Sequence, residues 1–532
     1  MSAKRGNSFV HQAAILAAAS LFVRFIGFLY RIPFTNWIGD IGIDNYNTAY
    51  QIYTFAIAVS SGALPVAVSR LVSERIAKKQ YHNAHQMFKI AMMFALVLGG
   101  LAGLIVGFGA NFFAGLLNAP EAALATRTLA PTLVVVAMLA VFRGYFQGMK
   151  TAVPTAISQV VEQILKVVIT LWLARMFRDA ISIQYAVAGG TIGTGVAAVA
   201  GLAVVAFLYA LVAKDLRNRS NNDVNRYTEE NKMTQIRAIF STALPMILAM
   251  VIFSVSGFLD LRMTISRMVG SGAFTIEEAQ ALRGQFTGKF ILLTTLPVAL
   301  SVALSAAVIP EITSSSVKMD TGAVKRKTNT ALHLSMILSI PSAVGLAVLA
   351  DPIIGLLFPR APEGGWLLRY GAVSIVFMAL VHVLTGTLQG LGHVKLPVIA
   401  AFVGVLTKIP VNHFLIGIPS INILGAVIST VVCFAVAAAI NMYFLYRHTG
   451  ILPNLTGAFI KPTVAATGMG MVCHIVHIVI STFAPTAIAT IAALGIGAMS
   501  YVVFMCLIKG FRKSDLQAAP LPGKIRRLLQ KL

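Results

Sequence analysis

The sequence predicts an all-α polytopic membrane protein with about fourteen transmembrane helices. Three observations lead to this fold class. Of 532 residues, 57% are hydrophobic and 11% are charged, and the mean hydropathy of +0.82 excludes a soluble globular chain. Apolar runs of roughly 20 residues or more recur along the whole chain, each long enough to cross a hydrocarbon core of about 30 Å. Basic residues collect in alternate loops, as the positive-inside rule requires.

The apolar runs define the elements in chain order, and their length favours helices over a barrel. The first run lies where a signal peptide would lie. However, it contains Arg24 and Arg31, lacks a small-x-small cleavage site and is followed by many more runs, so we count it as a span. The expected spans are 11–35, 46–75, 88–113, 125–148, 154–177, 185–213, 236–267, 284–313, 328–350, 366–391, 395–417, 421–447, 458–482 and 485–509.

The Lys/Arg distribution predicts that both termini are cytoplasmic, since an even number of spans places them on one side. Inward segments are rich in cations, whereas the first outward loop has Asp40 and Asp44 and no cation. The formal charge of +24 is then explained by cytoplasmic loops that contact anionic lipids, and nucleic-acid binding is disfavoured. The tail 510–532 is either a basic amphipathic helix on the inner leaflet or a disordered segment.

An internal repeat predicts two pseudo-symmetric six-helix lobes followed by two C-terminal helices. The motif Gly-x-x-Gln-Gly occurs twice, 242 residues apart, and Lys166 and Lys408 share this offset. Six helices are an even number, so both lobes face the same way and a substrate path between them is expected. The motif residues are Gly144, Gln147, Gly148, Gly386, Gln389 and Gly390. The expected domains are 1–213 (N-terminal lobe), 214–235 (basic linker), 236–450 (C-terminal lobe), 451–509 (two further helices) and 510–532 (basic tail).

Charges inside the spans are mostly positive. Only Glu162 and Asp260 are acids well inside spans, so water, backbone or a bound anion must satisfy most of the cations, because an isolated charge at mid-membrane costs about 3 kcal/mol or more. Two alternatives stay open at this stage: cations near span ends reach the interface with their long stems, and Glu162 pairs with Lys166 one turn away. The cations are Arg24, Arg31, Arg70, Arg143, Lys166, Arg262, Lys289 and Lys408.

Arg24 and Arg31 are the strongest candidates for binding an anion. They are seven residues apart, so one helix would present both on nearly the same face. Guanidinium stays protonated and offers forked hydrogen bonds to phosphate oxygens. No P-loop, HExxH, Cys-x-x-Cys or nucleophile elbow occurs in the sequence, so an enzyme is not expected.

Several segments resemble a known family. "LFVRFIGFLYRIPF", "AYQIYTFAIAVSSGALPVAVSRLVSE", "FRGYFQGM" and "LPVALSVALSAAVIPEI" are similar to the lipid II flippase and stage V sporulation protein B branch of the multidrug/oligosaccharidyl-lipid/polysaccharide exporter superfamily. The resemblance implies a cationic central cavity and a groove at the last two helices for a polyprenyl tail. It implies that the substrate is lipid II, which is moved from the inner to the outer leaflet of a bacterial cytoplasmic membrane. It also implies cell-wall synthesis proteins as partners.

The resemblance also implies roles for single residues. Arg24 matches a family arginine of the first helix, and the second family arginine falls at Tyr30 or Arg31, of which we assign Arg31. Asp44 matches a family acid, and Lys289 is the cation nearest to a family arginine of the eighth helix. No cofactor is expected. Coupling would use the membrane potential or Na⁺, for which the candidate ligands are Asp260, Asn412 and Thr430.

Three other functions stay open. A flippase for another polyprenyl-linked glycan, serving teichoic acid, capsule or spore cortex, would share the diphosphate and the tail. A cation-coupled drug exporter would place acids rather than arginines in its cavity, which the excess of intramembrane cations disfavours. A non-transporting scaffold for lipid-linked precursors, or a membrane-embedded glycan-processing enzyme, is the third.

Overall fold

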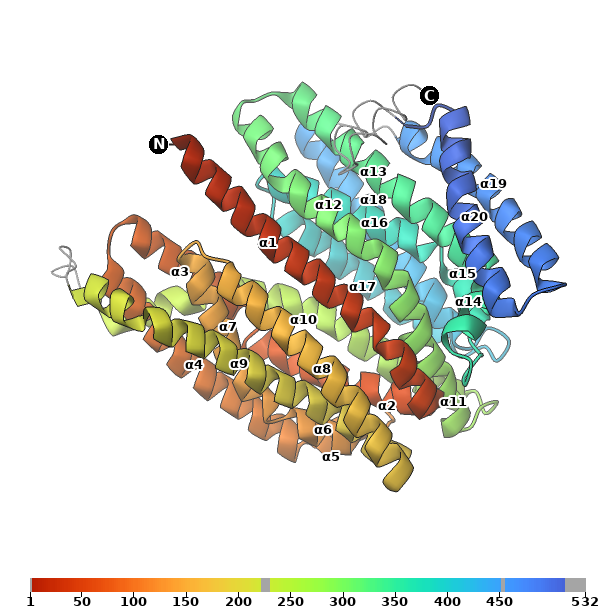
Figure 1. Ribbon diagram of the computed structural model, residues 1–532, viewed down its shortest axis with the longest axis horizontal. Helices are drawn as coiled ribbons and strands as arrows, with labels where there is room; N and C mark the ends of the chain where they lie inside the picture. Colours follow the sequence, from red (N-terminus) through yellow and green to blue (C-terminus); the bar gives the residue numbers. More distant parts are fainter. Residues whose placement is uncertain (1, 222–229, 451–454, 512–532) are drawn as a thin grey trace. The chain divides into compact units, whose positions relative to one another are not determined.

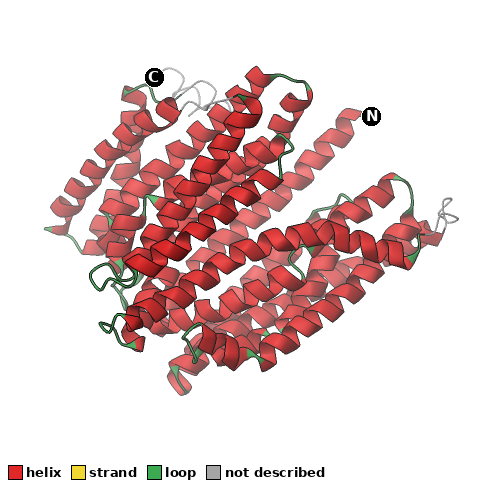
Figure 2. Cartoon of the chain, turned by 180° about the vertical axis from the view of Figure 1, so that it is seen from behind, coloured by secondary structure: helices red, strands yellow, loops and turns green. Residues whose placement is uncertain are grey.

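The computed structural model describes residues 2–221, 230–450 and 455–511, and this part of the chain is built from helices (Figures 1 and 2). Figure 2 shows no strand among the described residues. The predicted class, an all-α polytopic membrane protein, is confirmed. Parts of the predicted linker and tail, at 222–229 and 512–532, and the segment 451–454 lie outside the described residues.

Eleven helices of the described chain are long and apolar enough to cross a membrane, or thirteen if each of two bent helix pairs is one span. The thirteen overlap the predicted spans from 46–75 to 485–509, and the first of them, Arg31–Ala77, also covers the end of 11–35. The first predicted span, 11–35, corresponds to a helix whose apolar stretch among the searched residues is the shorter Ala18–Leu29. The count of fourteen therefore stays a prediction.

The chain divides into two compact units, Met1–Arg262 and Met263–Leu532. The domain boundaries expected from the repeat stay predictions. The first unit contains α1 (Ser2–Leu29), α2 (Arg31–Ser60), α3 (Leu64–Ala77), α4 (Tyr81–Phe108), α5 (Ala110–Leu116), α6 (Ala122–Leu129), α7 (Thr132–Gly148), α8 (Val153–Ala180), α9 (Ile183–Asn221) and most of α10 (Lys232–Gly270). The second contains the end of α10, α11 (Ile276–Gly284), a π-helical turn (Gln285–Phe290), α12 (Ile291–Val317), α13 (Thr321–Val348), α14 (Ala350–Leu357), α15 (Gly365–Gly371), α16 (Ser374–Gly390), α17 (Lys395–Leu415), α18 (Leu424–Thr449), α19 (Leu455–Ser481) and α20 (Thr486–Leu507).

The first helical run continues past the end of α1. Backbone hydrogen bonds from Tyr30 N to Ile26 O and from Phe34 N to Tyr30 O, both 3.2 Å, carry the helix across Tyr30. The true break is at Gly39, whose φ of +71° lies in the left-handed region that glycine adopts without strain. Arg24 and Arg31 therefore lie on one helical run, as their spacing predicts.

The Gly-x-x-Gln-Gly motif ends α7 in the first unit and α16 in the second, and it makes the same contact in both. A Cβ at Gly144 would come within 2.7 Å of Pro65 O, and one at Gly148 within 2.9 Å of Ser69 O. The two partner carbonyls are four residues apart on α3. The glycines therefore allow close backbone packing of α7 on α3.

In the second unit, α16 approaches α12 in the same way. A Cβ at Gly386 would come within 3.0 Å of Ser305 O, and one at Gly390 within 3.0 Å of Ile309 O. Again the two carbonyls are four residues apart. Each motif helix also follows a short helix at a bend, of 41° between α6 and α7 and of 52° between α15 and α16. The repeated motif thus marks a repeated packing arrangement.

Apolar side chains form the core within each unit. In the first unit one cluster joins α2, α6 and α9 around Phe34 and Tyr46, and another joins α3, α4 and α7 around Phe88. In the second unit α12, α13 and α16 pack around Ile375. Figure 1 shows α19 and α20 lying side by side as a helical hairpin.

Candidate functional site

Two partly buried cations of the first unit lie against a group of tyrosines, which we call the tyrosine cluster: Tyr30, Tyr46 and Tyr50. The hydroxyls of Tyr30 and Tyr46 share a hydrogen bond of 3.1 Å. The rings of Tyr46 and Tyr50 have centroids 4.6 Å apart. Lys166 Nζ lies 4.8 Å from the ring centroid of Tyr50, and Arg31 Cζ lies 5.9 Å from that of Tyr46. Three phenol groups and two cationic groups thus surround one small region of the unit.

Local sequence explains how the tyrosine cluster assembles. Tyr46 and Tyr50 are four residues apart on α2, so their side chains lie one above the other. The Gly39 break interrupts the helix between Tyr30 and Tyr46, and across this kink the hydroxyls of the two tyrosines meet. Lys166 comes from α8, and Tyr50 hydrogen-bonds the hydroxyl of Thr194 on α9. The site therefore requires four helical segments to pack together.

The electrostatics of this site favour an anion. Among the described residues, neither Arg31 nor Lys166 forms an ion pair with a carboxylate. Lys166 lies within electrostatic range of Arg31, which repels it, and of the Glu162 carboxylate, which attracts it. Each cation–π contact with a tyrosine ring stabilises its cation by only about 0.5–2 kcal/mol. A bound anion would remove the repulsion and receive charge-assisted hydrogen bonds from both side chains.

Glu162 does not pair with Lys166, although their spacing of one turn allows it. Its carboxylate instead accepts a hydrogen bond of 2.7 Å from Arg143 Nη2, an ion pair between α8 and α7. Arg143 Nε also donates to Ser158 Oγ at 3.0 Å. The predicted pairing of Glu162 with Lys166 is wrong, because spacing within one helix does not reveal a partner on a neighbouring helix.

The other cations and the acid predicted in the first unit lie outside the tyrosine cluster contacts. Arg24 and Arg70 are exposed, on α1 and α3, while Asp44 is fully buried in α2. Arg262 donates to Leu116 O at 2.9 Å and to Asn118 Oδ1 at 3.0 Å, so it holds the end of α5 against α10.

Lys289, in the second unit, is fully buried in the π-helical turn before α12. Its ammonium donates to the carbonyls of Ala361 and Glu363, at 2.7 and 2.9 Å, and lies 5.8 Å from the ring centroid of Phe358. The lysine therefore holds the connection between α14 and α15 in place. Lys408 is buried in α17.

The candidate sodium ligands are all buried, but two belong to one unit and one to the other. Asp260 lies in the first unit, and Asn412 and Thr430 lie in the second. The Thr430 hydroxyl donates to Ala426 O at 2.9 Å within its own helix. No group of three or more His, Cys, Asp or Glu side chains that could hold a metal ion occurs among the searched residues. Sodium binding stays a prediction.

An apolar groove of about 550 Å³ lies in the second unit, between the hairpin α19–α20 and helices α12 and α13. Leu293, Leu338 and Leu494 are among its lining residues, and Cys473 lies beside them. Polar side chains contribute little to this lining, since Ser342 and Tyr501 are its hydroxyl residues and no charged residue takes part. A long hydrocarbon chain is the type of ligand that such a groove fits.

Sequence reasoning identified the cations but missed the tyrosines. Tyr46, Tyr50 and Tyr53 follow one another at spacings of four and three, which places three phenols on one face of a helix. That spacing was the available signal. It did not reveal that Tyr30 and Lys166 would meet this face, because they come from other helices.

Solved structures of a flippase and of a multidrug transporter share the fold of this chain. A solved structure described as lipid II flippase MurJ in an inward closed conformation is 15% identical, covers 93% of this chain and 98% of its own, and has a TM-score of 0.68. An inward-facing multidrug resistance MATE family transporter is also 15% identical, covers 82% and 98%, and has a TM-score of 0.66.

The chain belongs to the polysaccharide biosynthesis protein family, whose model matches residues 9–316, more than half of its length. The MatE family model matches residues 245–414. Three Bacillus subtilis (strain 168) proteins are similar over nearly the whole chain. The uncharacterized membrane protein YabM is 25% identical, over 98% of this chain and 96% of its own length. Lipid II flippase MurJ is 27% identical, over 96% of this chain and 97% of its own length. Stage V sporulation protein B is 24% identical, over 98% of this chain and 99% of its own length.

Proposed function

We propose that this protein is a flippase that moves lipid II, an undecaprenyl-pyrophosphate-linked peptidoglycan precursor, from the inner to the outer leaflet by alternating access. The observation that carries the proposal is the tyrosine cluster with its two cations, Arg31 and Lys166, neither of which forms an ion pair with a carboxylate among the described residues. A diphosphate carries the negative charge that would neutralise these two cations. The relative named lipid II flippase, similar over 96% of this chain, supports the substrate.

In this proposal Arg31 and Lys166 bind the diphosphate. Arg31 offers forked donors and Lys166 a point charge, while the phenols of the tyrosine cluster donate to phosphate or sugar oxygens and present ring faces to the sugars. Arg24, exposed and on the same helical run as Arg31, extends the basic track. Lys289 positions a loop rather than touching substrate, because two backbone carbonyls already occupy its ammonium.

The polyprenyl tail would occupy the apolar groove beside α19 and α20. Its lining has no charged residue, so burial of an isoprenoid chain there is favourable at about 25 cal/mol per Å² of apolar surface. The diphosphate and the tail thus have separate sites, which suits a substrate whose charged head must cross the bilayer while its tail stays in hydrocarbon.

Transport follows from charge compensation. Binding of the anion neutralises mutually repelling cations, and this difference in affinity between states is what a conformational shift requires. With both termini cytoplasmic in a bacterial cytoplasmic membrane, as the loop charges favour, the inside-negative potential would return the empty cationic site inward. The driving free energy is about 2.3 kcal/mol per charge per 100 mV.

A second candidate is a flippase for another polyprenyl-linked glycan, such as a spore-cortex, teichoic acid or capsule precursor. It is favoured by the similar coverage of stage V sporulation protein B, a relative at 24% identity against 27% for lipid II flippase MurJ. All these substrates share the diphosphate and the tail, so the described sites fit each of them. The two candidates differ only in the glycan.

Complementation tests the proposal. A bacterium depleted of its own lipid II flippase would receive this chain, and lipid II reaching the outer leaflet would be measured. The native chain is expected to restore translocation, Lys166→Gln to reduce it at least ten-fold at equal membrane level, and Lys166→Arg to retain part of it. Arg175→Gln, which removes an exposed arginine of α8, is the matched control.

Normal protein level without any lipid II translocation would reject lipid II as the substrate. Restoration of translocation by the native chain, with full activity in both Lys166→Gln and Arg31→Gln, would reject the tyrosine cluster as the diphosphate site. The two failures are distinct, since the first concerns the native chain and the second only its variants.

A further inference from the structure

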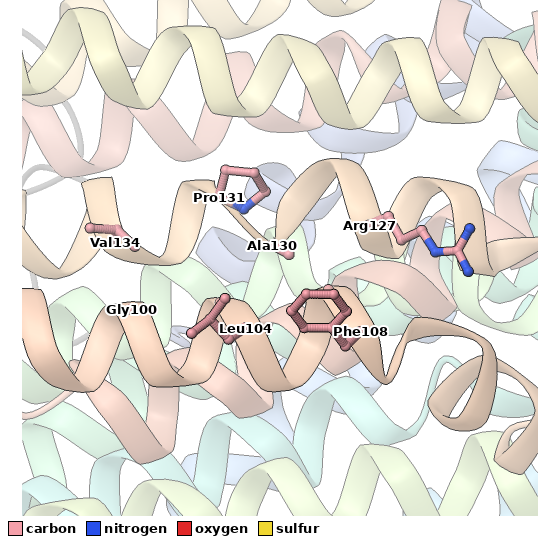
Figure 3. Close-up of a pocket in the computed structure, with 9 residues that line it drawn as sticks. Gly100, Leu104, Phe108, Arg127, Ala130, Pro131 and Val134 are labelled. Carbon is pink, nitrogen blue, oxygen red and sulfur yellow. The ribbon is translucent and has the colours of Figure 1, made fainter.

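A second groove lies in the first unit, between α4 and the bent pair α6–α7. Its volume is about 820 Å³ (Figure 3). The α4 side contributes Gly100, Leu104 and Phe108, and the other side contributes Arg127 and Pro131. None of these residues belongs to the tyrosine cluster or to the groove beside α19 and α20.

The groove exists because a helix bend faces glycines. Pro131 has no amide hydrogen to donate to the carbonyl of Arg127, which receives the amide of Ala130 at 3.2 Å instead, and α6 and α7 meet at 41°. Opposite this bend, Gly103 allows α4 to approach until a Cβ would lie 2.9 Å from Ala130 O. At Gly100 a Cβ would meet nothing within 4 Å, so the space there is open.

The walls are apolar and face outward from the unit. Leu104 is 58% exposed and Phe108 is 87% exposed, which in a membrane protein means contact with lipid. Arg127 is the only charged residue of the lining, and within the described chain no carboxylate pairs with its exposed guanidinium. Arg127 lies in the first helix of its bent span and Phe108 ends α4, so the charged end of the groove lies at a span end, where head groups lie.

We propose that this groove binds one anionic glycerophospholipid, with an acyl chain beside Gly100 and Leu104 and the phosphate on Arg127. The apolar walls accept the chain, and the guanidinium supplies the complementary charge at head-group depth. A zwitterionic lipid would fill the same groove with less selectivity, because its own cation competes for the phosphate. The proposal is independent of the transported substrate.

Fluorescence quenching tests it on the full chain in nanodiscs. The three native tryptophans, Trp37, Trp172 and Trp366, would be replaced by Phe, and Phe108→Trp would place one indole in the groove. Brominated phosphatidylglycerol and brominated phosphatidylcholine are then compared at equal mole fraction. One basic side chain at an anionic surface contributes about 1 kcal/mol, so about a five-fold preference for phosphatidylglycerol is expected.

Two further variants separate charge from shape. In the reporter chain, Arg127→Gln should abolish the preference while quenching by both lipids remains, and Gly100→Leu should reduce quenching by both lipids because the side chain fills open space. The controls are Arg175→Gln, an exposed arginine of α8, and Gly495→Leu, where a Cβ also meets nothing within 4 Å. Neither control should change quenching.

Equal quenching by the two lipids in the reporter chain that retains Arg127 would overturn the proposal, since the groove would then hold ordinary annular lipid. Displacement of brominated phosphatidylglycerol by a small mole fraction of undecaprenyl phosphate would overturn it as well, because the occupant would be a polyprenyl lipid. An unchanged thermal midpoint for each variant shows that altered quenching does not come from unfolding.

Discussion

Replacement of a motif glycine should destabilise the protein, whereas the same replacement at an unpacked glycine should not. In Gly386→Ala the new methyl group would lie 3.0 Å from Ser305 O and would collide with the Ser305 side chain. That side chain cannot turn away freely, since its hydroxyl donates to His382 O at 2.7 Å. At Gly495 on α20 a Cβ meets nothing within 4 Å.

The expected magnitudes follow from these contacts. Crowding of a packed interface costs about 1–3 kcal/mol, and a lost hydrogen bond costs about 1 kcal/mol. Alanine recovers about 1 kcal/mol because it is a better helix former than glycine. Gly386→Ala is therefore destabilised by about 1–3 kcal/mol, and Gly495→Ala, which gains only the helix term, is stabilised by up to about 1 kcal/mol.

Thermal unfolding in detergent, followed with a thiol-reactive dye, measures the difference. Cys433 and Cys473 are buried free thiols that become reactive only on unfolding. For a unit of this size, the midpoint should fall by about 3–8 °C in Gly386→Ala and rise by about 1–3 °C in Gly495→Ala. Midpoint shifts of the same sign in the two variants would refute the reasoning, because helix propensity would then outweigh the backbone contact. Gly144→Ala should behave like Gly386→Ala, since it faces Pro65 O.

Three other substitutions test the contacts of charged side chains. Lys289→Met should lower the free energy of unfolding by about 1–3 kcal/mol, since the backbone carbonyls of Ala361 and Glu363 lose their donor, and a midpoint equal to that of the native chain would contradict this. Arg143→Leu should destabilise by about 1–3 kcal/mol because it leaves Glu162 unpaired in a partly exposed site, and adding Glu162→Gln should recover most of the loss in a double-mutant cycle. Arg262→Gln should free the end of α5 and make residues 117–121 more sensitive to limited proteolysis at unchanged thermal midpoint; identical cleavage rates would show that the two hydrogen bonds do not hold this segment.

Much of the fold was predictable because the bilayer restricts the choices. Thirteen helices or bent pairs overlap predicted spans, since a run of about 20 apolar residues in hydrocarbon must satisfy its backbone within a helix. The bends themselves were not predicted. They depend on local features such as Pro131 and on the helices that pack against them, which hydropathy does not encode.

The candidate site was predictable only in part. The excess of intramembrane cations predicted an anionic ligand, but the sequence did not distinguish the roles of Lys289, Lys166 and Arg262. In the structure Lys289 holds two carbonyls and Arg262 holds a helix end, whereas Lys166 faces tyrosine rings. The Glu162–Lys166 pair was wrong for the same reason, because Arg143 on α7 takes the carboxylate.

By itself, the sequence determined that this is a helical membrane protein with a repeated glycine motif and more intramembrane cations than acids. Composition and spacing along one chain are sufficient for that, since lipid imposes helices and each helix has a fixed period. Only the tertiary structure decided which cations bond carboxylates or carbonyls and which form no ion pair within the described chain. The reason is geometric: the partner of a buried charge usually lies on another helix, and the register between helices is set by side-chain packing.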